Sequence, residues 1–160
     1  MDRQVLEAIR EMMTVHRVLS LAVLVDGDPE AGLLPFAVRP DFGAVYVQAS
    51  GLARHSRGLQ PGARVGVLIH ENDTPEADPL QVKRLTVQAT VAVLDRDGEA
   101  FAAAREIFVG RLPGAEVTLN LGDFNLYELQ LGRGRYIAGF GQAFNIGPDT
   151  FKDVAQLEAT

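Results

Sequence analysis

The stretch V-L-S-L-A-V-L-V-D-G-D-P-E-A-G-L-L-P-F-A-V, residues 18–38, decides the fold that the sequence predicts. An almost purely apolar segment, residues 18–25, ends at the turn D-G-D-P of residues 26–29, and a second apolar segment covers residues 31–38. Short apolar runs bounded by Asp, Gly and Pro are typical of β-strands, and a tight turn joins such strands in opposite directions. Residues 18–38 therefore predict a β-hairpin.

Similar apolar runs recur along the rest of the chain. Residues 84–94 alternate, with Leu85, Val87 and Ala89 on one side and Thr86 and Gln88 on the other, as in a strand with one buried face. Further strands are predicted at residues 44–47, 64–70, 124–131 and 135–144. The last two are expected to form a closing hairpin around the turn Gly132-Arg133-Gly134.

Helices are expected at both ends of the chain and around the middle. Residues 2–16 repeat apolar side chains at three- and four-residue steps, which is the pattern of an amphipathic helix. Further helices are predicted over residues 52–59, 99–110 and 148–159, while residues 112–122 are ambiguous. Consecutive strands joined by short turns favour antiparallel pairing, and closing the sheet would remove its edges. The sequence thus predicts one mainly β domain, residues 1–160: a six- to seven-stranded antiparallel β-barrel with peripheral helices.

Bulk composition excludes several classes of function. The formal net charge of −6 gives no general attraction to nucleic acid or to an anionic membrane. The chain has no cysteine, so disulfides, thiolate catalysis and cysteine-held metal clusters are ruled out. No segment has the pattern of a signal peptide or reaches the roughly 20 apolar residues of a membrane span. A cytoplasmic protein is expected.

A knot of polar donors interrupts this acidic chain between two predicted strands. Arg54, His55, Ser56 and Arg57 are consecutive, and an arginine fork matches the oxygens of a phosphate group. A solvated basic turn is the alternative, because most charge clusters only interact with water.

Four segments of the chain resemble one known family. They are L-A-V-L-V-D-G-D-P with L-L-P-F-A (residues 21–29 and 33–37), S-G-L-A-R-H-S-R-G-L with A-R-V-G-V-L (50–59 and 63–68), D-P-L-Q-V-K-R-L-T-V-Q-A (78–89), and D-F-N-L-Y-E-L with Y-I-A-G-F-G-Q-A (123–129 and 136–143). In this order they resemble the FMN-binding split barrels related to pyridoxamine 5′-phosphate oxidase, and most closely their haem-utilisation branch.

The resemblance implies an FMN-binding homodimer that holds its flavin in a groove between two barrels. By motif position, it assigns eight residues to the cofactor: Leu33, Ala49, Ser50, Arg54, His55, Ser56, Arg57 and Arg84. His55 stands where the family has a phosphate-binding lysine, which would make that contact depend on pH.

Other departures narrow the activity that the resemblance implies. The oxidase has an Arg and a Lys near the position of Leu33, and an Arg-x-His set near its C-terminus, and this chain has neither. Oxidation of pyridoxamine phosphate is therefore not expected. Haem-degrading members ligate iron through a C-terminal histidine, whereas this chain has no histidine after His70.

Three functions remain open on the sequence alone. The first is an FMN-dependent oxidoreductase acting on a small molecule, with no evident catalytic acid or base and no metal site. The second is a haem- or tetrapyrrole-binding protein, for which His16, His55 and His70 are the only histidine ligands. The third is a non-catalytic scaffold that has lost its cofactor.

Overall fold

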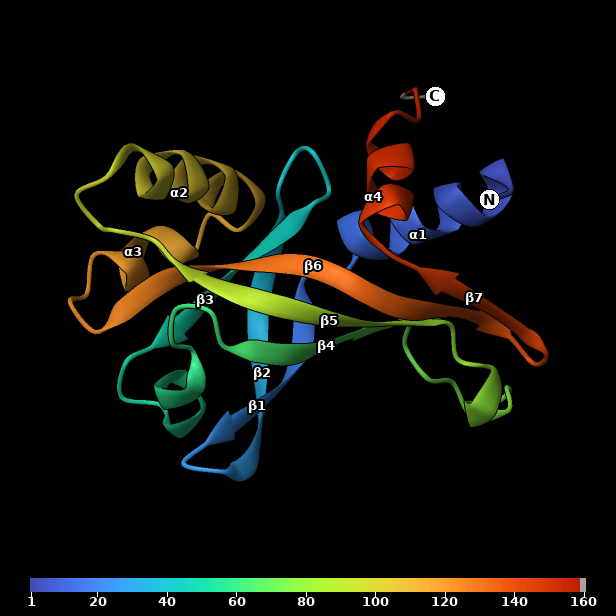
Figure 1. Ribbon diagram of the computed structural model, residues 1–160, viewed down its shortest axis with the longest axis horizontal. Coiled ribbons are helices and arrows are strands. Elements are labelled where there is room, and N and C mark those ends of the chain that lie inside the picture. Colours follow the sequence, from blue (N-terminus) through green and yellow to red (C-terminus); the bar gives the residue numbers. More distant parts are fainter. Residues whose placement is uncertain (159–160) are drawn as a thin grey trace.

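The computed structural model, which describes residues 1–158, is built around a closed antiparallel β-barrel (Figure 1). The sheet order is β3-β2-β1-β4-β5-β6-β7, and pairing of β3 with β6 closes the first six strands into the barrel. The strands are β1 (Val18–Val25), β2 (Asp28–Val38), β3 (Ala44–Ser50), β4 (Arg64–His70), β5 (Arg84–Val93), β6 (Phe124–Gly139) and β7 (Gln142–Ile146). The predicted barrel is confirmed, with β7 added to its edge.

The hairpin of residues 18–38 forms with a tighter turn than expected. Asp26 and Gly27 both have positive φ angles, 52° and 83°, as a two-residue Asp-Gly turn between strands requires. Val25 therefore pairs directly with Asp28, so β2 begins three residues earlier than residue 31.

The predicted closing hairpin around Gly132-Arg133-Gly134 is wrong. These residues lie inside β6, a single strand of 16 residues, and the turn comes later, at Gly139-Phe140-Gly141. Gly139 and Gly141 have φ angles of 147° and 74°, so the glycine pair serves this turn and not a close backbone approach. The close approach is at Gly134 instead, where a Cβ would lie 2.1 Å from the carbonyl oxygen of Thr86.

Two terminal helices complete the main core. Helix α1 (Arg3–Val15) begins after Asp2, whose carboxylate accepts a bond from the Gln4 amide at 3.1 Å. Helix α4 (Pro148–Ala155) packs beside α1 (Figure 1), and the buried side chains of both join those of the barrel interior. The helix ends at Ala155, so the prediction that it continues is wrong for residues 156–158, and residue 159 lies outside the described residues.

A second apolar cluster covers part of the barrel's outer surface. Helices α2 (Glu99–Arg111) and α3 (Ala115–Leu119) pack on the outward side chains of β2, β3 and β6, including Tyr46 and Leu126. The ambiguous segment 112–122 thus contains a short helix. Two single turns, η1 (Arg54–Gly58) and η2 (Pro79–Gln81), complete the elements. No helix in residues 1–158 has the length and apolar character needed to cross a membrane.

Replacing Gly134 by alanine should destabilise the protein strongly. The added methyl group must displace the β5 backbone at Thr86, and overpacking of this kind costs about 1–3 kcal/mol of unfolding free energy. Gly122→Ala is the matched control, because a Cβ at Gly122 would meet no atom within 4 Å. Urea denaturation compares the two variants, and equal midpoints would show that β5 and β6 are not in close contact at this point.

Candidate functional site

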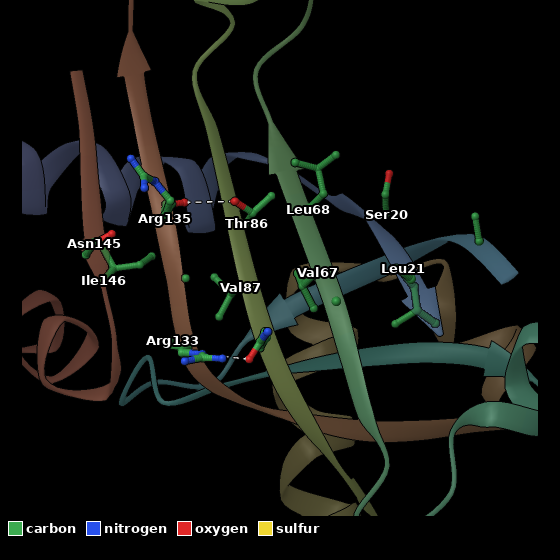
Figure 2. A pocket seen from close by; sticks show the side chains of 15 residues that line it. Ser20, Leu21, Val67, Leu68, Thr86, Val87, Arg133, Arg135, Asn145 and Ile146 are labelled. Atoms are coloured by element: carbon green, nitrogen blue, oxygen red, sulfur yellow. Dashed lines mark hydrogen bonds between the residues drawn. The ribbon is translucent and has the colours of Figure 1, made fainter. Parts of the chain in front are cut away.

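One face of the barrel is not covered by any helix of residues 1–158. The outward side of β1, β4 and β5, with parts of β2, β6 and β7, lines an open groove of about 780 Å³ (Figure 2). Helices α2 and α3 cover the outside of β2, β3 and β6, and α1 and α4 pack against the barrel interior. The groove is therefore open to another molecule.

Small side chains make the floor of this groove flat. Ala22 of β1 pairs with Ala31 of β2 on one side and with Gly66 of β4 on the other. A Cβ placed on Gly66 would lie 3.3 Å from that of Ala22, so a larger residue at position 66 would crowd the floor. Leu68 lines the groove beside Ser20, and Leu33, the cross-strand partner of Ser20, stands next to it with 68% of its surface exposed. The floor thus offers a flat, largely apolar surface.

Two arginines of β6 border the groove. Arg133 and Arg135 are two residues apart on the exposed face, and their side chains stand on the β6 side in Figure 2. Arg133 Nε donates to Gln88 Oε1 at 3.2 Å, and Arg64 Nη2 donates to the same oxygen at 2.9 Å. Within residues 1–158, none of these three arginines forms an ion pair with an acid. In a chain of net charge −6, this side of the groove is suited to an anionic group such as a carboxylate.

The structure brings together the predicted donor knot, but its charges are already paired. Arg54 forms an ion pair with Glu30 of β2, which raises the pKa of the guanidinium further. Arg57 lies 3.4 Å from the Asp26 carboxylate. Ser56 is buried and donates to the Ser50 carbonyl oxygen at 2.6 Å. These bonds fasten η1 to the first hairpin and to the end of β3.

His55 is the exception in this knot. Its ring packs on the backbone of Gly32, where a Cβ would lie 3.0 Å from the ring atoms. Its Nε2 is the one buried side-chain nitrogen or oxygen without a hydrogen-bond partner in the described part of the chain. A buried polar atom of this kind is costly unless something else satisfies it.

The other predicted cofactor residues are dispersed. Ala49 is 2% exposed and belongs to the barrel core, whereas Ser50 at the strand end donates to Asp123 Oδ2 at 3.2 Å. Arg84 pairs with His70 at the end of β4, and its Nη1 donates to the carbonyl oxygens of Leu80 and Val82 at 3.2 and 2.9 Å. Because η1 precedes the start of β4, Arg84 and the donor knot lie at opposite ends of that strand. Contact of all eight residues with a flavin stays a prediction.

Sequence reasoning missed the groove residues Arg133, Arg135, Ala22 and Gly66. It assigned residues 132–134 to a turn, which removed Arg133 from the sheet and placed Arg135 at the start of a separate strand. The available signal was the R-G-R spacing of residues 133–135, which puts two arginines on the same face of a continuous strand.

Comparison with known proteins gives related sequences and folds. No family model matches the chain. The chain is 30% identical over 155 residues to heme oxygenase HutZ of Vibrio cholerae, covering 94% of this chain and 85% of that protein. The crystal structure of HutZ, there described as a heme storage protein, superposes with a TM-score of 0.68 at 26% identity and covers 86% of this chain and 92% of that one.

Two further solved structures have a similar fold. A heme binding protein from Mycobacterium smegmatis gives a TM-score of 0.80 at 25% identity over 96% of this chain, which spans 62% of that protein's length. A Clostridium acetobutylicum protein of the pyridoxinephosphate oxidase family gives 0.69 at 14% identity, over 94% of this chain and 99% of that one, a likeness of fold alone. The chain belongs to the family of HutZ, and it shares its fold with a protein of the pyridoxinephosphate oxidase family.

Proposed function

We propose that the protein binds haem in the outer groove and serves in haem utilisation. The observation that supports this most directly is the groove itself, a flat floor of small side chains bordered by Arg133 and Arg135 without acidic partners. The relationship to HutZ, which is described as a heme oxygenase and as a heme storage protein, also supports haem as the ligand.

The residues of the groove fit the chemistry of haem. Haem is a flat, largely apolar macrocycle that carries two carboxylates on one edge. The floor around Ala22 and Gly66 offers the flat apolar surface, and the two arginines offer forked donors to the carboxylates. The groove volume of about 780 Å³ also falls in the range of about 300–1,000 Å³ found for small-molecule sites.

Each part of the groove then has a separate task. The apolar floor excludes water from one face of the macrocycle, and Arg133 and Arg135 set its orientation through its carboxylates. Haem itself supplies the one-electron and dioxygen chemistry of iron when bound. The chain contributes binding, orientation and the exclusion of water.

A titration with hemin, followed by Soret absorbance, tests this site. The double variant Arg133→Ala/Arg135→Ala should lose at least about tenfold in affinity, since one hydrogen bond to a charged group contributes about 1.5–3 kcal/mol. Arg3→Ala is the control, because it removes a positive charge from an exposed position on α1, outside the groove. Unchanged affinity in the double variant would contradict the assignment of the groove.

The same proposal includes a second copy of the chain, which would cover the open side of the groove. The groove is open on one side, and Leu24 and Leu33 of the neighbouring hairpin are exposed by 61% and 68%. A homodimer would shield these side chains and the outer face of the macrocycle from water. Sedimentation of the hemin-loaded protein should give the mass of two chains. A mass of one chain at micromolar concentration would overturn this part of the proposal.

FMN is the second candidate ligand, and the buried, unpartnered Nε2 of His55 favours it. A phosphate beside Arg54, His55 and Arg57 could satisfy this nitrogen, provided that Arg54 gives up its bond to Glu30. Arg54→Ala should then lower flavin affinity by about 1.5–3 kcal/mol, while Arg133→Ala should leave it unchanged. Flavin absorbance after desalting measures both variants. Wild-type protein that retains no flavin would remove this candidate.

A further inference from the structure

Two arginines from different strands converge on one side chain beside the groove floor. Gln88 of β5 lines the groove and pairs directly with Gly66, a floor residue of β4. Its Oε1 accepts a hydrogen bond from Arg64 Nη2 at 2.9 Å and another from Arg133 Nε at 3.2 Å, the second drawn as a dashed line in Figure 2. The two guanidinium groups are therefore held beside each other at the edge of the floor.

The register of the sheet brings both arginines to Gln88. On β4, Arg64 lies diagonally across from Gln88 on the same face, within reach of a long side chain. On the other side, the pairing of β6 with β5 shifts between Val87 and Ala89, which places a β-bulge opposite Gln88. Bulges redirect side chains and are frequent next to functional sites. The arginine pair thus depends on strand pairing, because its members are far apart in the sequence.

The amide oxygen of Gln88 leaves the charges of this pair uncompensated. The Gln88 side chain is neutral, and neither arginine forms an ion pair with an acid within residues 1–158. Neighbouring positive groups repel each other, and the repulsion grows when a ligand covers them and excludes water. A carboxylate in place of the amide oxygen would offset both charges and accept shorter, stronger hydrogen bonds from both guanidinium groups. The pair therefore suits an anionic oxygen better than the side chain that it now holds.

A second set of donors lies further along β6. Arg135 follows Arg133 by two residues, so the two side chains leave the same face of the strand about 6.6 Å apart. Asn145 of β7 pairs directly with Arg135, and both residues line the groove (Figure 2). The groove thus has two neighbouring donor sets, and each contains an arginine fork that matches a carboxylate.

We infer that the groove binds the two carboxylates of haem at separate sites. Arg64 and Arg133 together take one carboxylate, which displaces the Gln88 side chain. Arg135 takes the other carboxylate. This inference rests on the proposed function, because it takes haem as the ligand. It adds Arg64 and Gln88 to the binding site, and it makes the groove selective for ligands that carry two neighbouring carboxylates.

Titration with two probes, hemin and hemin dimethyl ester, tests the role of Arg64, because the ester has no free carboxylate. Arg64→Ala should lower hemin affinity by at least about tenfold, as expected for a lost hydrogen bond to a charged group, and leave ester affinity unchanged. Arg105→Ala is the matched control. Arg105 Nη2 also donates to a neutral amide oxygen, that of Asn120 at 3.0 Å, but it lies on α2, outside the groove.

Two substitutions of Gln88 test whether a carboxylate takes its place. In Gln88→Glu, the new carboxylate would pair with both arginines and occupy the site permanently. This variant should melt at a higher temperature than wild type and bind hemin at least about tenfold more weakly. Gln88→Ala removes the neutral acceptor without adding a charge, so it should bind hemin at least as tightly as wild type.

A double-mutant cycle tests whether Arg64 and Arg133 share one carboxylate. Either single substitution to alanine removes their mutual repulsion, so the double variant should lose less hemin affinity than the product of the two single losses. Arg64→Ala and Arg135→Ala should combine as the full product, because these two arginines bind different carboxylates.

The outcomes distinguish this inference from the proposed function. If wild-type protein binds neither hemin nor its dimethyl ester, the proposed function fails and the inference fails with it. If hemin binds but Arg64→Ala keeps wild-type affinity, or weakens hemin and the ester equally, the inference fails while haem binding stands. Hemin binding of wild-type strength in Gln88→Glu would overturn the inference in the same way.

Discussion

The pairing of strand β6 with three other strands is the interaction on which the rest of the structure depends. Residues 124–130 of β6 pair with β3 and close the barrel. Residues 127–137 pair with β5, and residues 134–139 pair with β7. The same strand contributes both groove arginines. Gly134 lies between them, at the point where the β5 backbone approaches too closely for any side chain. Closure of the barrel and the charge beside the groove therefore depend on one segment.

Two clusters of arginines on this chain differ in whether acidic side chains pair with them. Arg54 and Arg57 at η1 face acids of the first hairpin, so their charges largely serve the folded chain itself. Arg133 and Arg135 form no ion pair with an acid within residues 1–158 and border an apolar floor. The sequence alone favours the first cluster, because His55 and Ser56 join its two arginines into a run of four consecutive polar side chains. The structure favours the second as a ligand site, since an unpaired cation can bind an anion without first losing a partner.

Local signals were sufficient to predict much of the fold. The bounds of β1 and β4 follow from apolar runs, and helix α1 follows from the apolar spacing of residues 2–16; both are properties of neighbouring residues. The β6 error arose because Gly-Arg-Gly also signals a turn, and only the approach of β5 shows why glycine is required there. The groove could not be predicted for a similar reason. It depends on which strands become neighbours and on which faces the helices leave bare, so Ala22 and Gly66 acquire their role only through pairing.

Backbone amide NMR with gallium protoporphyrin, a diamagnetic analogue of haem, tests the central claim that the outer groove is the ligand site. The account predicts that the largest chemical-shift changes occur at Ala22, Gly66 and Thr86, with small changes in η1. Changes centred on Arg54, His55 and Ser56 with an unperturbed β4 would contradict it, and would place the ligand at the donor knot instead.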